Sequence, residues 1–173
     1  FRPVLARSVA KGEIPESWKD WEGRARISIA VPLETSLDQG RLYCFLPLGP
    51  EGVAPFAGYL NANFYTKMDR RSVDPGICLN DHFLRMGAWL SCQLINLMVS
   101  INWSESPGAV VSLLCWTGEY LVDLKRAMGE GGQGILRRPF LPVQTRGGGL
   151  EWGSPEESYT WTAAPDTCMS LDR

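Results

Sequence analysis

A short basic cluster is the clearest chemical signal in this chain of 173 residues. Lys67, Arg70 and Arg71 follow an alternating segment, GYLNANFYT, and Asp69 lies among them. An arginine side chain stays charged and binds two oxygens of one phosphate group at once. The cluster therefore indicates a phosphate-binding site at a strand end. The alternative is a solvated turn with a local ion pair, which contributes little free energy.

Other catalytic patterns are weaker. His82 is the single histidine, so any Ser-His or Cys-His catalysis would have to use it. The sequence contains no GxSxG and no HExxH, which favours a surface or capping histidine over a hydrolase or a metal centre. The glycine-rich GEGGQGILRR lacks a GK[ST] ending and follows no strand, so it is predicted to be a helix stop and connector. A self-contained hydrolase using His82 is the last alternative.

Three segments alternate between apolar and polar residues as half-buried strands do: ARISIAVPL, RLYCFLP and GYLNANFYT. In the third, the apolar residues are expected to face a core. Its other face then carries Tyr59, Asn61, Asn63 and Tyr65. This polar face is expected either to contact solvent or to bind a moving loop or a partner.

Helical spacing of apolar residues predicts a long helix that ends at Ser100, with Asn80 or Asp81 as its N-cap. A second helical region is predicted over residues 107–114 and then 118–128. These helices follow the strands in the chain instead of alternating with them. We therefore predict an α+β fold, in which a small mixed or antiparallel sheet is packed by two or three helices.

The last part of the chain is predicted to be a β-hairpin followed by a short helix. PFLPVQT and LEWG are the strands, and Ser154 with Glu157 has the spacing of a capping box. The expected organisation is a lead-in segment over residues 1–23, an α+β domain over 24–130 and a small β-rich closing element over 131–173. Two tryptophans of the lead-in, Trp18 and Trp21, are expected to pack on the core.

Composition limits the classes of partner. The net charge of −2 argues against bulk electrostatic binding of nucleic acid. The five cysteines are far apart and form no CxxC pair, which predicts free thiols and a reducing, cytoplasmic location. No apolar run is long enough to span a membrane, so no membrane partner is expected. The chain begins with Phe1 instead of Met, and we expect a fragment of a longer polypeptide.

Several phrases of the sequence, namely FLPLG, PFAGYLNANFYTK, DRRS and LNDHFLRMGAWL, resemble one segment of the sacsin-like ATPases. These belong to the ninety-kilodalton heat-shock chaperone (GHKL) superfamily, and the segment follows their ATP-binding domain. The resemblance extends in blocks over residues 18–162. It implies a transducer, or middle, domain that supplies an arginine to the terminal phosphate of ATP. Arg70 matches that catalytic position best, and Arg71 and Lys67 are the further phosphate-contacting candidates.

The resemblance also implies that ATP and Mg²⁺ are held by an upstream domain of the same polypeptide. The acidic catalytic residue, the magnesium-binding asparagine and the glycine-rich lid of that domain are not found in this sequence. The chain is therefore expected to bind no cofactor alone and to show no ATPase activity alone. The alternative is a non-catalytic module whose polar sheet face and basic edge bind a protein client or a nucleic acid.

Overall fold

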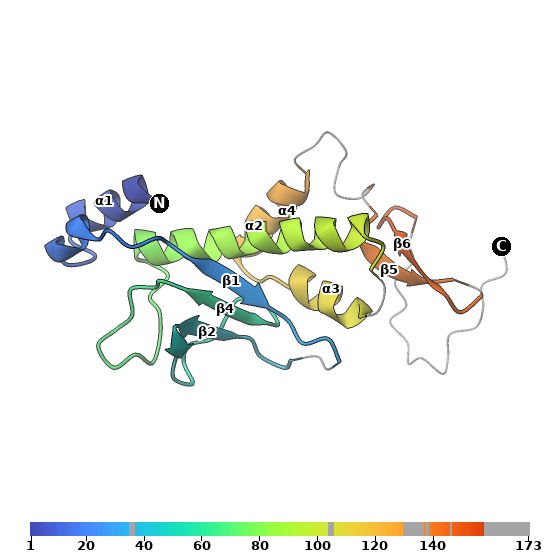
Figure 1. Ribbon diagram of the computed structural model, residues 1–173, viewed down its shortest axis with the longest axis horizontal. Coiled ribbons are helices and arrows are strands. Elements are labelled where there is room, and N and C mark those ends of the chain that lie inside the picture. Colours follow the sequence, from blue (N-terminus) through green and yellow to red (C-terminus); the bar gives the residue numbers. More distant parts are fainter. Residues whose placement is uncertain (35–36, 104–105, 130–136, 138, 146, 158–173) are drawn as a thin grey trace.

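The computed structural model describes residues 1–34, 37–103, 106–129, 137, 139–145 and 147–157. One long helix, α2 (Cys78–Ser100), runs through the middle of the molecule, and a small sheet lies along one side of it (Figure 1). Helices α3 (Pro107–Leu114) and α4 (Glu119–Gly129) also pack against α2. The predicted α+β class is confirmed.

The sheet is mixed, and its strands do not follow chain order. They lie in the order β1 (Ile27–Ala30), β4 (Tyr59–Ala62), β2 (Arg41–Cys44) and β3 (Leu46–Pro47). Strand β4 is antiparallel to β1 and parallel to β2, whereas β3 turns back beside β2. Strand β4, which comes last of the four in the chain, is therefore one of the two central strands of the sheet.

The predicted alternation along β4 is confirmed. Leu60 and Ala62 are buried beneath α2, while Tyr59 and Asn61, which alternate with them, are only partly buried on the opposite face. Helix α2 approaches the sheet closely at Gly87, where an added Cβ atom would lie 2.9 Å from the Trp116 ring and 3.2 Å from the Leu60 side chain. A residue without a side chain is therefore needed at this crossing.

Helix α2 ends at Ser100 as predicted, but its beginning was predicted wrongly. The helix starts at Cys78 and its N-cap is Ile77, not Asn80 or Asp81. The Asn80 side chain is buried, accepts a hydrogen bond from the Tyr65 N–H, and donates to the carbonyls of Tyr65 and Asp74. This asparagine thus holds the preceding loop against the helix.

The first 23 residues contain two helices that the sequence pattern did not reveal. Helix α1 (Arg2–Ala10) lies at the N-terminal end of α2, and a 3₁₀-helix, η1 (Glu16–Asp20), follows it (Figure 1). Trp18 and Trp21 pack against the core, as expected. The Trp18 ring meets Tyr65 edge-on at 5.6 Å between centroids.

The closing hairpin is present as predicted. Strands β5 (Leu141–Gln144) and β6 (Leu150–Gly153) pair antiparallel. The Ser154 hydroxyl donates to the Glu157 carboxylate at 2.8 Å, and the Glu157 N–H donates to the Ser154 carbonyl. Residues 155–157 form a turn, and the rest of the predicted short helix lies outside the described residues.

None of the helices in the described ranges has both the length and the apolar character needed to cross a membrane.

Candidate functional site

The predicted basic cluster lies in the connection between β4 and α2. A β-bridge between Thr66 and Val73 closes this connection into a loop, and we call residues 67–71 at its tip the basic loop. All five of these residues are exposed. The sequence predicted the cluster at the end of a strand over GYLNANFYT. Strand β4 already ends at Ala62, so the basic loop does not directly follow the strand.

Arg70 lies in the left-handed backbone region, at a φ of 53°, inside the turn of the basic loop. Its guanidinium Nη2 donates a hydrogen bond of 2.8 Å to the carbonyl oxygen of Cys44, at the end of β2. It forms no ion pair with any described residue. The Arg70 side chain is thus positioned by a neutral acceptor, and its positive charge is not neutralised.

The other two basic residues differ from each other. Arg71 forms an ion pair of 3.0 Å with Glu51, and both side chains are more than half exposed. The Asp69 carboxylate accepts a hydrogen bond of 3.0 Å from the Arg71 backbone N–H and so stabilises the turn. Lys67 is exposed and has no ion pair in the described part of the chain. The phosphate-contacting role of all three residues stays a prediction.

A pocket of about 340 Å³ is lined in part by Cys44, the residue whose carbonyl accepts the hydrogen bond from Arg70. Three segments meet there: η1 with the chain leading into β1, the end of β2, and the residues that follow β4. We call it the end pocket, because it lies where the parallel strands β2 and β4 end. Burial raises the pKa of the Cys44 thiol in its wall, although nearby Arg70 acts in the opposite direction.

The asparagines of the polar sheet face fix two walls of this pocket. The Asn61 side-chain oxygen accepts a hydrogen bond of 3.1 Å from the Phe45 N–H, and the Asn63 oxygen accepts one of 2.9 Å from the Arg26 N–H. Phe45 has a φ of 65°, which few residues other than glycine adopt. Each amide oxygen thus already accepts one hydrogen bond from the backbone next to a strand, which fixes the orientation of both side chains.

The alternative chemistries gain no support from the described residues. His82 is partly buried in α2, and burial lowers its pKa. No group of three His, Cys, Asp or Glu side chains in the described ranges could hold a metal ion. Cys44, Cys78 and Cys115 are free thiols, whereas Cys168 lies outside the described residues. Most of the GEGGQG segment also lies outside them.

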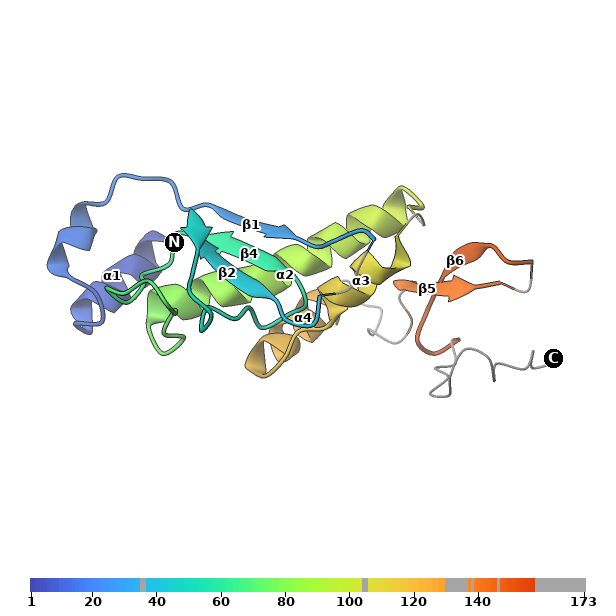
Figure 2. The ribbon, with the colours of Figure 1, turned by 90° about the horizontal axis from the view of Figure 1, so that it is seen from below.

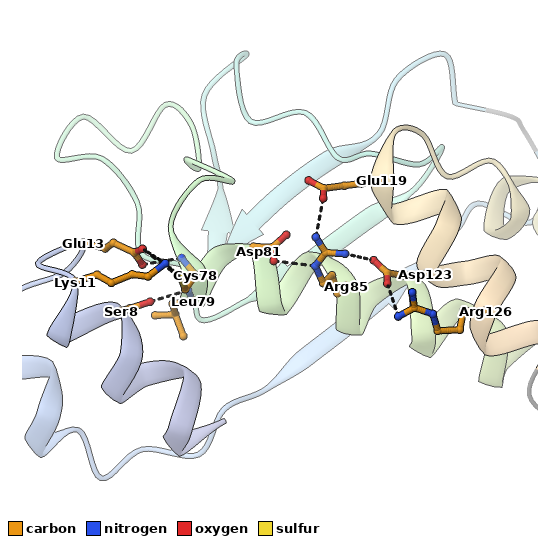
Figure 3. Close-up of polar contacts among 10 residues, drawn as sticks. All are labelled: Ser8, Lys11, Glu13, Cys78, Leu79, Asp81, Arg85, Glu119, Asp123 and Arg126. Atoms are coloured by element: carbon orange, nitrogen blue, oxygen red, sulfur yellow. Dashed lines mark hydrogen bonds and ion pairs between the residues drawn. The ribbon is translucent and has the colours of Figure 1, made fainter.

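Sequence reasoning missed a cluster of charges between α2 and α4 (Figure 3). Arg85 bonds to Asp81 at 2.8 Å, to Glu119 at 2.6 Å and to Asp123. The hydrogen bond to Asp81, joined by the other carboxylates, raises the pKa of Arg85. The spacing of Asp81 to Arg85 along one helix was the available signal. The cluster joins the two helices, and its arginine is already neutralised.

A second missed cluster explains why α2 needs no capping side chain of its own (Figure 3). The Ser8 hydroxyl accepts a hydrogen bond from the Leu79 N–H at 2.9 Å, and the Glu13 carboxylate accepts one from the Cys78 N–H at 2.8 Å. Lys11 lies 3.4 Å from the same carboxylate. Side chains of α1 and of the turn after it thus satisfy free N–H groups of the first turn of α2.

The chain was compared with known proteins in three ways. No protein-family model, no curated protein and no solved structure matches it.

Proposed function

We propose that this chain is a transducer-type module of a sacsin-like, chaperone-type ATPase. In this proposal Arg70 contacts the terminal phosphate of ATP that an upstream domain of the same polypeptide holds. The observation that supports it most is the state of Arg70, which is exposed, held by one neutral carbonyl and unpaired with any described carboxylate. An arginine in this state can exchange its acceptor for a phosphate oxygen.

The exchange is energetically reasonable. Arg70 makes one hydrogen bond to the neutral Cys44 carbonyl, whereas a phosphate group is an anion that can accept two hydrogen bonds from the guanidinium at once. Lys67 lies in the same loop and adds positive charge without needing to break an ion pair. In systems where an arginine reaches a nucleotide from another domain, it raises the rate by about 10³-fold or more.

In the part of the chain that the structure describes, no group of three His, Cys, Asp or Glu side chains could hold a metal ion, and the proposal follows the resemblance in assigning both ATP and Mg²⁺ to the upstream domain. When bound, these groups supply the phosphoryl chemistry, and this chain supplies only charge and position. The proposed location is the cytoplasm, which the free thiols of Cys44, Cys78 and Cys115 support.

The test compares ATP hydrolysis by the natural full-length polypeptide and by its Arg70→Ala variant. We expect hydrolysis to fall by about 10³-fold while the affinity for ATP changes little. Arg41→Ala, which removes an exposed arginine at the opposite end of β2, is the matched control and should retain full activity. Unchanged hydrolysis, loss of ATP binding, or a natural polypeptide that binds no ATP would each contradict the proposal.

A second candidate function is a non-catalytic binding module for a protein or a nucleic acid. No described helix lies on the sheet face opposite α2 (Figure 2). This face carries two tyrosines, Tyr43 and Tyr59, with ring centroids 5.8 Å apart. Salt-sensitive binding of RNA or DNA by the isolated chain would favour this candidate over the first.

A further inference from the structure

The end pocket combines aromatic walls with positive charge. Its volume of about 340 Å³ falls in the range of small-molecule sites, roughly 300–1,000 Å³. The rings of Trp18 and Trp21 line one side, 6.3 Å apart between centroids and tilted by 33°. Phe45 is a further aromatic residue of the lining and is 76% exposed, whereas Phe64 borders the pocket but has its ring buried against Phe83. Such walls fit a flat ring better than an aliphatic chain.

The charge in the pocket has one sign. Arg24 and Arg26 line it, and no acidic side chain of the described residues does. Both arginines are exposed, and neither forms an ion pair with a described residue. The nearest acidic residues of this segment, Asp20 and Glu22, line a separate hollow beside the same tryptophans. A ligand with a negative group therefore fits the end pocket better than a neutral or cationic one.

The walls are held in place without a ligand. The Trp21 ring folds back over Gly23, where an added Cβ atom would lie 2.5 Å from the indole. The same ring packs edge-on against Phe1 at 5.1 Å. On the opposite wall, the bond from Phe45 to Asn61 fixes the end of β2. A pocket that is already formed requires little ordering of side chains when a ligand binds.

We propose that the end pocket binds a small, flat aromatic carboxylate. Its ring packs against Trp18, Trp21 and Phe45, and its carboxylate accepts hydrogen bonds from Arg24 and Arg26. This proposal is independent of the one made for Arg70, because ligand binding in the end pocket requires neither ATP nor an upstream domain.

The first measurement uses 2-naphthoate, an aromatic carboxylate, and 2-naphthamide, its neutral counterpart, with the full chain. Binding is followed by calorimetry and by the NMR signals of the tryptophan indole N–H groups, assigned through Trp18→Phe and Trp21→Phe. We expect 2-naphthoate to shift the signals of Trp18 and Trp21 and to bind at least about tenfold more tightly than 2-naphthamide. Equal binding of both compounds, shifts confined to other tryptophans, or no saturable binding would overturn the proposal.

The second measurement removes the charge and leaves the rings. In Arg24→Gln with Arg26→Gln, the affinity for 2-naphthoate should fall by about tenfold or more, while that for 2-naphthamide stays the same. The matched control, Arg2→Gln with Arg7→Gln, removes two exposed arginines from α1 and should bind both compounds like the wild type. An equal loss in the control pair would show a general charge effect and overturn the assignment to this pocket.

Discussion

Two arginines of this chain, Arg85 and Arg70, have similar neighbours in the sequence and opposite surroundings in the structure. Each has an aspartate close by along the chain, Asp81 and Asp69 respectively. Asp81 bonds to Arg85, and two further carboxylates from α4 complete its surroundings. Asp69 turns to a backbone N–H instead, and Arg70 donates to a neutral carbonyl.

The difference shows what decides whether an arginine supports the fold or remains available for a ligand. On the helix side, around α2, each charge meets an opposite charge or a helix N–H group (Figure 3). In the basic loop, Arg70 and Asp69 bond to backbone groups, and Arg71 has only an exposed ion pair with Glu51. Since exposed ion pairs contribute about 0–1 kcal/mol, the loop charges do little for stability and are free to serve binding. Three substitutions test this comparison.

The largest effect is expected for Arg85→Met, which leaves three carboxylates between α2 and α4 without their common partner. The Arg85 side chain is 38% exposed, so solvent weakens the penalty, and we expect the free energy of unfolding to fall by about 2 kcal/mol. Arg70→Met should lower it by less than about 0.5 kcal/mol. Urea denaturation of both variants measures the difference.

Arg126→Met is the matched control for Arg85. Arg126 is 71% exposed and its nearest contact with Asp123 is 3.9 Å, so its loss should change stability by less than about 0.5 kcal/mol. Equal destabilisation by the Arg85 and Arg70 substitutions would contradict the claim that Arg85 supports the fold and Arg70 does not.

A smaller effect is expected for Ser8→Ala, which removes the acceptor of the Leu79 N–H at the start of α2. Loss of a capping hydroxyl lowers the free energy of unfolding by about 1 kcal/mol, and this one is fully buried. Ser17→Ala, at an exposed position of η1, should have almost no effect. Hydrogen exchange at the Leu79 amide gives a local readout, and unchanged protection there would contradict the capping role.

The smallest effect is a change in acid sensitivity with Glu13→Gln. Burial alone would raise the pKa of Glu13, but the hydrogen bonds from Cys78 and its neighbours outweigh it and lower the pKa below its ordinary value of 4.5. A carboxylate whose pKa is lower in the folded state stabilises the protein above its unfolded pKa, and this is lost as the pH falls through the folded value. The wild type should therefore lose more thermal stability than the variant below about pH 4.5. Identical acid slopes of the melting temperature would exclude this contribution.

Local patterns predicted the elements well where a periodic face meets the core. The alternation along β4 and the end of α2 at Ser100 were predicted because both depend on residues close in the sequence. The order of the strands was not, since placing β4 between β1 and β2 depends on contacts between distant segments. The N-cap prediction failed at Asn80, because nothing local shows that its amide is used by the loop before it.

For the candidate site too, features formed by neighbouring residues could be predicted, and features formed by distant segments could not. Lys67, Arg70 and Arg71 were predicted as one cluster because they lie within a few residues of one another. The end pocket was not predicted, since its walls come from segments as far apart as Trp18 and Phe64. The pairing of Arg71 with Glu51 also depends on how two loops meet in space.

The central place of β4 has a consequence for synthesis on the ribosome. Among the described residues, β1 pairs only with β4, and β2 has only short β3 and a single bridge to Val53 until β4 appears. During synthesis, which proceeds from the N-terminus, β1 and β2 therefore keep unpaired edges until β4 (Tyr59–Ala62) has left the exit tunnel. Open strand edges favour pairing with other chains. We therefore expect the nascent chain to be most prone to aggregation after β1 and β2 have emerged from the ribosome and before β4 has emerged.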